Sequence, residues 1–185
     1  MTSTALYSTQ EALGTFSFCK LDPSKHASTL HAWVTRPYAN FWLMQNHSVE
    51  EVEKYYVDFH QKENNQAYLG FLDESPCFLI EAYDPKFDEV GETFENKEGD
   101  IGLHFLVAPS DKPIAGFTLS IIVAIMKFIF SLSEVQRVVV EPDARNEKLL
   151  ALNKYFNVGT RDIELTDKTA KLAFYTRADY ENYFR

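Results

Sequence analysis

The sequence predicts a mixed α/β fold, with a central β-sheet flanked by helices in a single domain. Of its 185 residues, 45% are hydrophobic and 15% aromatic, enough for the core of one domain. Residues 101–108 are almost continuously apolar, which is typical of a strand buried on both faces, and residues 135–141 (VQRVVVE) predict another central strand. An apolar segment of helical length, residues 116–131, lies between them. Strand, helix and strand therefore alternate around a sheet.

The first third of the chain predicts one strand followed by two helices. Aromatic and polar residues alternate over 13–19, as in a half-buried strand, and residues 1–12 are expected to be a flexible N-terminal segment. Asp22 followed by Pro23 predicts a helix start, because proline at the first helical position loses no hydrogen bond. The segment Ser48-Val-Glu-Glu51 predicts a capping box at the start of the second helix.

The same patterns give about seven strands and about four helices in all. The predicted strands span residues 13–19, 66–72, 76–83, 101–108, 135–141, 160–165 and 171–177. The predicted helices begin at Pro23, Val49, Gly116 and Glu147. Gly159 fits the left-handed residue that ends the last of these helices.

Charge and cysteine content exclude several classes of function. The chain has 18 Lys and Arg against 27 Asp and Glu, a net charge of -9, so a nucleic-acid partner is not expected and any phosphate must be held locally. Cys19 and Cys77 form neither a disulfide framework nor a zinc motif, so we expect no metal and a cytoplasmic location. No signal peptide is evident, and the apolar run 114–126 is too short to span a bilayer, so no membrane partner is expected.

A loop between the central strand and the apolar helix is one candidate for ligand binding. Gly116 stands where the helix begins, and backbone N–H groups at a helix start can hold an anion such as a pyrophosphate. Gly116 is equally suited to close packing, and Pro113 to starting a helix. Spacing alone leaves both interpretations open.

Two titratable residues near the ends of central strands are candidates for proton transfer. His104 and Asp143 supply an imidazole and a carboxylate, and adjacent strands can bring them together. Each also has an ordinary structural explanation. A histidine in an apolar strand is often a core residue, while Asp143 fits an Asx turn, Arg145 a solvated charge and Asn146 a helix cap.

The motifs in these segments resemble a known family. The stretches Gly99-Asp-Ile-Gly-Leu-His104 and Glu141-Pro-Asp-Ala-Arg-Asn146 look like the two signatures of the siderophore-biosynthesis branch of the GNAT acyltransferases. That branch includes the lysine N-acyltransferases of mycobactin synthesis and the N-hydroxylysine acetyltransferases of aerobactin and rhizobactin synthesis. His31-Ala-Trp33 and Phe41-Trp42 resemble its amino-terminal pattern. The resemblance runs from about Phe16 to Tyr175.

The resemblance implies a GNAT fold and an acyl-coenzyme A-dependent N-acyltransferase. The implied reaction moves an acetyl or succinyl group from coenzyme A to N6-hydroxylysine or an N-hydroxydiamine and forms a hydroxamate for siderophore biosynthesis. It also implies a functional link to an N-hydroxylating monooxygenase and a siderophore synthetase. His104 and Asp143 match the catalytic pair of the branch, with Asp143 expected as the general base, directly or with His104.

The resemblance further implies where the two substrates bind. The pantetheine arm is expected between strands 101–108 and 135–141. The loop Lys112-Pro-Ile-Ala-Gly-Phe117, which has fewer glycines than the usual Gln/Arg-x-x-Gly-x-Gly/Ala signature, is expected at the pyrophosphate. The implied coenzyme-binding residues are Leu106, Val107, Lys112, Ile114, Ala115, Gly116, Phe117, Thr118 and Asn146.

Aromatic and acidic residues supply candidates for the acceptor site. Trp33, Phe41 and Trp42 are implied, with His104, to line the acceptor pocket, although packing of a helix pair on the sheet explains the three aromatic residues equally well. Glu81 or Asp84 is a candidate partner for a distal ammonium group.

Two other functions stay open at this point. One is a GNAT N-acetyltransferase that acts on a protein N-terminus, a polyamine or an aminoglycoside. The other is a noncatalytic module that binds acyl-coenzyme A. Thiol release in the presence of candidate acceptors discriminates among all three.

Overall fold

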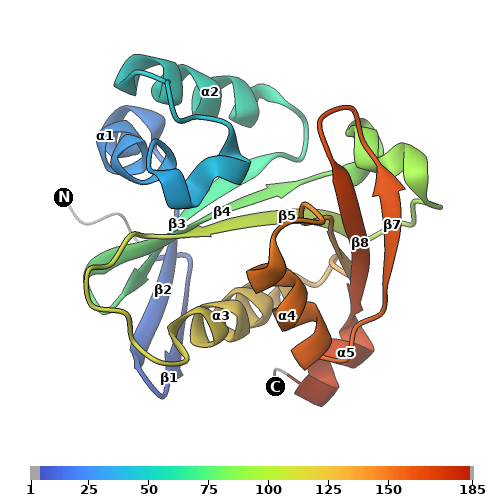
Figure 1. Cartoon of the computed structure of the whole chain (residues 1–185). Coiled ribbons are helices and arrows are strands. Elements are labelled where there is room, and N and C mark those ends of the chain that lie inside the picture. The colour runs from blue at the N-terminus through green and yellow to red at the C-terminus, as the bar shows by residue number, and fades with distance from the viewer. Residues whose placement is uncertain (1–4, 184–185) are drawn as a thin grey trace. The chain divides into compact units, whose positions relative to one another are not determined.

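The computed structural model describes residues 5–183 and confirms a mixed α/β fold built on one sheet (Figure 1). Its eight strands follow the order β1-β2-β3-β4-β5-β6-β8-β7. The chain divides into two compact units. The first holds the chain up to Ala82 together with Phe105–Ile121, and the second holds Tyr83–His104 together with the chain from Ile122 onward. The described part has one strand and one α-helix more than the sequence predicts.

The first unit is built on antiparallel strands. They are β1 (Tyr7–Glu11), β2 (Gly14–Lys20), β3 (Gln66–Leu72) and β4 (Ser75–Tyr83), of which the last residue belongs to the second unit. Each pairs with the next. Strand β1 corrects the prediction of a flexible N-terminal segment (residues 1–12) over residues 7–11, while residues 1–4 of that segment lie outside the described part. Its sequence is too polar for an apolar alternation, but backbone pairing with β2 across the turn at Gly14 holds it in the sheet.

Two helices lie side by side in the first unit (Figure 1). Helix α1 (Pro23–Val34) begins at Pro23 as predicted, and the 3-10 helix η1 (Pro37–Trp42) follows it. Helix α2 (Val49–Gln61) starts with the predicted capping box, because the Glu51 N–H donates to Ser48 Oγ at 3.2 Å and the Ser48 N–H to Glu51 Oε2 at 2.7 Å.

The second unit places the central strands of the sequence prediction next to each other. In β5 (Asp100–Val107) and β6 (Arg137–Val140), residues Asp100–Gly102 pair in parallel with Arg137–Val139. Strand β8 (Thr169–Thr176) pairs antiparallel with β6 and with β7 (Thr160–Glu164), which confirms the predicted hairpin. Two 3-10 helices, η2 (Pro85–Phe87) and η3 (Glu89–Thr93), precede β5.

Three helices complete the chain. Helix α3 (Phe117–Ser131) is the predicted apolar helix, and its residues after Ile121 belong to the second unit. Helix α4 (Glu147–Tyr155) ends earlier than predicted, and the left-handed residue that follows it is Asn157 (φ 53°) rather than Gly159. Asparagine adopts this conformation more readily than most residues, so it replaces the expected glycine. Helix α5 (Arg177–Tyr183) was not predicted.

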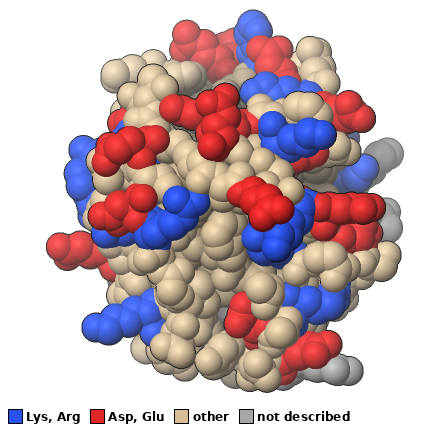
Figure 2. Space-filling view, turned by 90° about the vertical axis from the view of Figure 1, so that its right-hand side faces the viewer, with Lys and Arg blue, Asp and Glu red and all other residues tan. Residues whose placement is uncertain are grey.

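Charged side chains of both signs lie on the surface drawn in Figure 2. Acidic and basic side chains are interspersed on the face drawn in Figure 2, where they do not separate into one broad basic area.

Among the helices of residues 5–183, none is long and apolar enough to cross a membrane. Within the same residues, no three His, Cys, Asp or Glu side chains are grouped so that they could hold a metal ion.

Candidate functional site

A buried carboxylate directly after β6 gathers three hydrogen-bonding or charged groups in the second unit. The two oxygens of Glu141 are divided between them. His104 Nε2 lies 2.5 Å from Oε1, and the Tyr83 hydroxyl donates to Oε2 at 3.0 Å. Lys168 Nζ lies 3.6 Å from Oε1. These contacts join residues from β4, β5, the end of β6 and the turn before β8.

The charge state of Glu141 follows from these contacts. Burial alone would raise the pKa of the carboxyl group, but the charge and hydrogen bond of His104, the charge of Lys168 and the Tyr83 hydroxyl together lower this pKa to about 2. Near neutral pH the group is therefore an ionised carboxylate, which can only accept hydrogen bonds.

His104 has the most exposed side chain of the ion pairs in this network, ahead of Lys168 at 21%. Its side chain is 41% exposed, against 4% for Glu141. The residue lies on β5 two positions beyond Gly102, where the registered pairing with β6 stops. A partly solvent-exposed imidazole that is paired with a carboxylate is suited to exchanging a proton with a small molecule.

The glycine at position 102 leaves room for the ring of Tyr83, whose hydroxyl donates to Glu141. A Cβ atom at Gly102 would lie 2.2 Å from Tyr83 Cζ, so the tyrosine ring fits only against a glycine. The same ring lies 5.0 Å from the His104 ring, centroid to centroid. The close contact with the Tyr83 ring therefore explains why a glycine stands in the Gly-Leu-His stretch.

Asp143 makes contacts that differ from the predicted pairing with His104. Its carboxylate accepts from Arg145 Nε at 2.8 Å, Arg145 Nη2 at 2.6 Å and the Arg145 N–H at 2.8 Å. The hydrogen bonds and charge of Arg145 lower the pKa of Asp143, although burial opposes the change. Asp143 is buried, and its backbone forms an isolated bridge with Ala170. The predicted Asx-turn geometry is therefore present, and a catalytic role for Asp143 stays a prediction.

Asn146 has the structural role that the sequence offered as an alternative. It is the N-cap of α4, and its side-chain oxygen accepts from the Leu149 N–H at 3.4 Å. The predicted contact between Asn146 and the coenzyme also stays a prediction.

Residues 112–118 of the predicted coenzyme loop belong to the first unit, whereas Asn146 belongs to the second. Residues 112–116 are all exposed and lead into α3, which begins at Phe117. Gly116 has a φ of 76°, and a Cβ atom added there would meet nothing within 4 Å. Glycine thus serves the backbone conformation at this point and not close packing. At the start of α3 the Phe117 N–H donates to the Ile114 carbonyl at 3.2 Å, and the Ser120 N–H donates to the Gly116 carbonyl at 2.9 Å.

The remaining predicted coenzyme residues lie at the end of β5. Leu106 is buried, while the carbonyl of Val107 accepts a hydrogen bond from the Tyr38 hydroxyl at 2.9 Å. Tyr38 lies in η1, so this hydrogen bond fixes the segment between α1 and α2 to the end of the strand.

The aromatic residues predicted for the acceptor pocket differ in exposure. Trp33 is buried in the core as part of α1, whereas Phe41 is exposed and Trp42 half-buried in η1. Trp33 therefore packs in the core, which was the alternative to a place in the acceptor pocket. All three belong to the first unit, and His104 to the second.

The two candidate partners for a distal ammonium also lie in different units. Glu81 is buried on β4 in the first unit, where burial and the charge of Glu81 raise the pKa of Tyr56. Asp84 in the second unit caps η2 by accepting from the Lys86 N–H at 3.0 Å.

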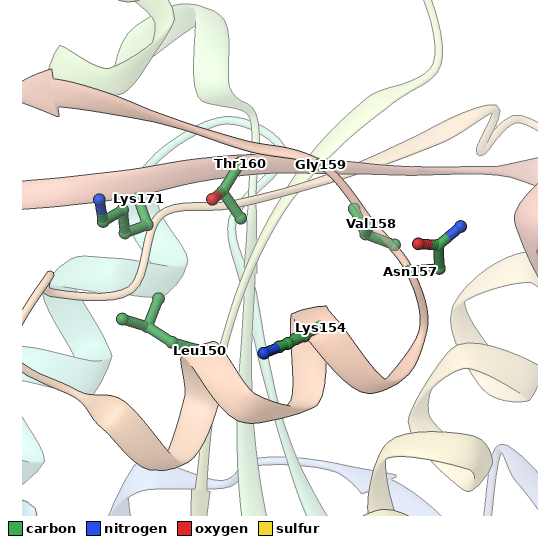
Figure 3. Close-up of a pocket in the computed structure, with 7 residues that line it drawn as sticks. All are labelled: Leu150, Lys154, Asn157, Val158, Gly159, Thr160 and Lys171. Carbon is green, nitrogen blue, oxygen red and sulfur yellow. The ribbon is translucent and has the colours of Figure 1, made fainter.

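A separate pocket of about 370 Å³ opens between α4 and the β7–β8 hairpin (Figure 3). Its lining consists of Leu150, Lys154, Asn157, Val158, Gly159, Thr160 and Lys171. Lys171 forms an ion pair with Asp162, which offsets its charge. The lining contains none of the residues that the sequence predicts for the site.

Comparison with known families decides the class of the protein. The model of the acetyltransferase (GNAT) domain matches residues 22–164, well over half of the chain. The chain belongs to the GNAT acetyltransferase family. The predicted GNAT fold is thereby confirmed, and so is an acyltransferase that uses acyl-coenzyme A as co-substrate.

Solved structures resemble this GNAT domain over most of its length. An uncharacterized protein from Bacillus halodurans is 22% identical with a TM-score of 0.87, and the match covers 98% of this chain and 95% of that one. The aminoglycoside acetyltransferase AAC(6')-Ib in complex with coenzyme A is 17% identical with a TM-score of 0.78, covering 91% of this chain and 98% of that one. A spermidine N-acetyltransferase chimera from Vibrio cholerae and hSSAT is 12% identical with a TM-score of 0.66, covering 90% and 98%. No curated protein sequence matches the chain.

Sequence reasoning missed the partners of His104 in this GNAT domain. Glu141 stands inside the Glu-Pro-Asp-Ala-Arg-Asn stretch, in which the resemblance pointed to Asp143 as the catalytic carboxylate. The position of Glu141 directly after a buried strand was the sequence signal that could have indicated its role. Tyr83 and Lys168 gave no signal of their own, since only the fold brings them to Glu141.

Proposed function

We propose that this GNAT domain transfers an acetyl group from acetyl-coenzyme A to a primary amino group of a small polycationic amine, of the aminoglycoside or polyamine class. The observation that carries the proposal is the His104–Glu141 pair, a solvent-accessible imidazole on a buried carboxylate within a GNAT domain. The pair supplies the general base that an ammonium acceptor requires before it can attack a thioester.

The residues of the chain account for the proton transfers of this reaction. The ammonium group first loses one proton to His104, which passes it to solvent. As the new N–C bond forms and the C–S bond breaks, the nitrogen loses a second proton to His104, which gives it to the departing thiolate. The products are an N-acetylated amine and coenzyme A, whose sulfur ends as a thiol. Acetyl-coenzyme A, when bound, supplies the activated acyl carbon. His104 becomes positively charged when it takes a proton. The negative Glu141 carboxylate beside it stabilises this protonated form.

The loop before α3 is suited to the phosphate groups of the co-substrate. It is exposed, glycine occupies the position with positive φ, and a helix of 15 residues follows. The segment 112–118 thus leads into a helix N-terminus, which is a favourable environment for phosphate even in a chain of net charge -9.

Two lines of support favour a polycationic amine over an N-hydroxylated acceptor. Structural relatives with a named substrate include an aminoglycoside acetyltransferase and a spermidine N-acetyltransferase. The net negative charge also suits a cationic acceptor. The alternative acceptor class from the sequence therefore has better support than the siderophore branch.

An N-hydroxyamine acceptor, as in siderophore synthesis, is the second candidate. It rests on the segments 99–104 and 141–146, which resemble the siderophore branch and contain both members of the His104–Glu141 pair. N-Hydroxylysine needs less help in losing a proton than an ammonium group does, so the two candidates differ in how much they depend on His104.

A matrix of donors and acceptors tests the proposal. Thiol release is measured from acetyl- and succinyl-coenzyme A with kanamycin, ribostamycin, spermidine and N6-hydroxylysine. We expect the highest kcat/KM for acetyl-coenzyme A with kanamycin, ribostamycin or spermidine. A preference for N6-hydroxylysine would instead establish the second candidate, and no turnover with any acceptor would contradict both.

Variants of the two predicted catalytic residues belong in the same matrix. His104→Ala is expected to lower kcat by about 100-fold or more, the typical contribution of a general base. Asp143→Asn tests the second predicted base. Because Arg145 occupies the Asp143 carboxylate, we expect a smaller loss from Asp143→Asn than from His104→Ala. The reverse order would make Asp143 the principal base.

A further inference from the structure

We infer that His26 and His60 form an acid-sensitive junction in the first unit, in which two neutral imidazoles hold helices α1 and α2 to strands β2 and β3. The histidine junction consists of the two rings and of the backbone N–H groups of Asp22 and Ala67 that donate to them. Protonation of either ring breaks its hydrogen bond and loosens the attachment of its helix. The inference goes beyond the proposed acetyl transfer and does not depend on it.

His60 completes the β2–β3 ladder at the point where β2 ends. Lys20 and Tyr68 are the last pair in the register of the two strands. The Leu21 N–H still donates to the Ala67 carbonyl at 2.9 Å. In a continued antiparallel ladder the Ala67 N–H would donate back to the Leu21 carbonyl. It donates instead to Nε2 of His60 at 3.1 Å, so a side chain of α2 takes the place of the strand.

His26 makes the corresponding contact where β2 leads into α1. Asp22 is the N-cap residue of α1, and its N–H donates to Nδ1 of His26 at 3.1 Å, one turn into the helix. The same turn is closed by the His26 N–H, which donates to the Asp22 carbonyl at 2.9 Å. The imidazole therefore fixes the residue that joins the strand to the helix.

The chemistry of these contacts requires neutral rings. A backbone N–H is a donor only, so the ring nitrogen that faces it must carry a lone pair, whatever the other nitrogen of the ring contacts. The Gln66 side-chain nitrogen, also a donor, lies 3.2 Å from the same nitrogen of His60. A protonated imidazole carries a proton on both nitrogens and cannot accept. Acid thus leaves the N–H of Ala67, a residue that is 0% exposed, without its acceptor.

The charged groups around the two rings agree with this requirement. Burial lowers the pKa of His60, and the charge of Lys20 at the end of β2 lowers this pKa further. Burial also lowers the pKa of His26, where the charge of Asp22 opposes the change and the charge of Lys25 adds to it. The dipole of α2 favours a cation in the last turn, where His60 lies, but burial and Lys20 outweigh it.

The junction holds both ends of one helical segment, residues 23–61. One histidine stands in the first turn of α1 and the other in the last turn of α2. Between these ends lie Trp33 of α1 and Phe41 and Trp42 of η1, the aromatic residues predicted for the acceptor pocket. Mild acid therefore acts on the attachment of the whole segment that carries them.

The first test is amide hydrogen exchange of the wild-type protein, which needs no variant. Protection factors of the Asp22 and Ala67 N–H groups are measured between about pH 8 and about pH 5 and corrected for the intrinsic pH dependence of exchange. We expect both to fall by roughly tenfold or more below pH 6.5, the ordinary pKa of histidine. The protection of Leu69, which lies inside the β2–β3 ladder, should stay constant. Constant protection of Asp22 and Ala67 would overturn the inference.

The second test is the double variant His26→Gln with His60→Gln. The glutamine oxygen can accept from the same N–H groups, but it does not titrate. Because the folded state favours neutral rings, the junction stabilises the wild type fully above pH 6.5 and loses this effect as the pH falls below 6.5.

Melting temperatures of the wild type and the double variant measure this loss. Between about pH 7.5 and about pH 5, we expect the wild type to lose about 2–4 °C more than the double variant. Work above pH 4.5 keeps the Glu141 carboxyl group ionised in both proteins, so this group does not contribute to the difference. Parallel losses in the two proteins would overturn the inference.

His31→Gln is the matched control, because His31 also lies on α1 and contacts the backbone with the opposite polarity. Its Nε2 lies 3.0 Å from the His47 carbonyl, which only accepts, so the ring can donate this hydrogen bond in both charge states. The control should keep the pH dependence of the wild type, and its loss in this variant would also contradict the junction. None of the measurements uses a substrate. Absence of acetyl transfer would therefore remove the proposed function and leave the junction to be decided by exchange and melting.

Discussion

At the scale of single residues, the main energetic feature is the compensation of one buried charge. Transfer of the Glu141 carboxylate out of water is unfavourable, and His104, Tyr83 and Lys168 together offset that cost. Removal of one partner leaves a buried charge with less compensation. The network that prepares the base should therefore also contribute to folding stability, and pH reveals this contribution.

The pKa of Glu141 predicts how stability depends on pH. Folding lowers the pKa from 4.5 to about 2, so the folded state favours the ionised form. The ionised Glu141 carboxylate therefore stabilises the folded state by on the order of 3 kcal/mol above pH 4.5, and this stabilisation is lost as the pH falls from 4.5 to about 2. Chemical denaturation of the wild type and Glu141→Gln at several pH values measures it. The difference in free energy of unfolding should be largest above pH 4.5 and narrow on acidification, and a constant difference would contradict the assignment.

At the scale of elements, the fit of β4 against β5 determines whether the network can form. The Tyr83 ring occupies the space where any residue other than glycine at position 102 would place its Cβ. The requirement is steric, and it explains why a glycine stands inside a buried strand where it would otherwise reduce stability.

Gly102→Ala tests this fit, with Gly159→Ala as the control. The new Cβ would lie 2.2 Å from Tyr83 Cζ, so the ring must move and its hydrogen bond to Glu141 should be lost. We expect a loss of about 1–3 kcal/mol in free energy of unfolding, as for overpacked cores, together with reduced kcat. Gly159 has no atom within 4 Å of an added Cβ, so its variant should stay near wild type in both. Equal stability of the two variants would contradict the steric argument.

Local signals predicted most elements correctly, and the exceptions have physical causes. The capping box at Ser48 and the proline start at Pro23 are encoded within a few residues, so the starts of α2 and α1 were predicted. Strand β1 has too few apolar residues for its period to show, and its pairing with β2 makes it a strand. Helix α4 ended early because Asn157 adopted the left-handed conformation that sequence rules assign first to glycine.

At the scale of the whole molecule, the candidate site shows where sequence reasoning stops. His104 was a candidate because an imidazole near the end of a central strand suits proton transfer, whereas its partner lies 37 positions away, directly after another strand. The pairing depends on the parallel register of Asp100–Gly102 with Arg137–Val139, which no local pattern specifies. Asp143, two residues from Glu141, was chosen from a motif that cannot tell which carboxylate faces the histidine.

The net charge of -9 predicts a further property of the whole molecule, a dependence of acceptor capture on ionic strength. An acidic protein attracts a polycation more strongly than a monocation, and added salt screens this attraction over about 10 Å at 0.1 M. Under the proposed function, kcat/KM for spermidine should fall several-fold, roughly three- to tenfold, between about 0.01 M and about 0.3 M NaCl. With acetyl-coenzyme A saturating, the value for a monoamine acceptor should fall much less. The ratio of the two slopes isolates acceptor charge, because salt effects on the fold and on co-substrate binding are common to both. Equal slopes would show that the negative charge serves solubility and has no part in selecting the acceptor.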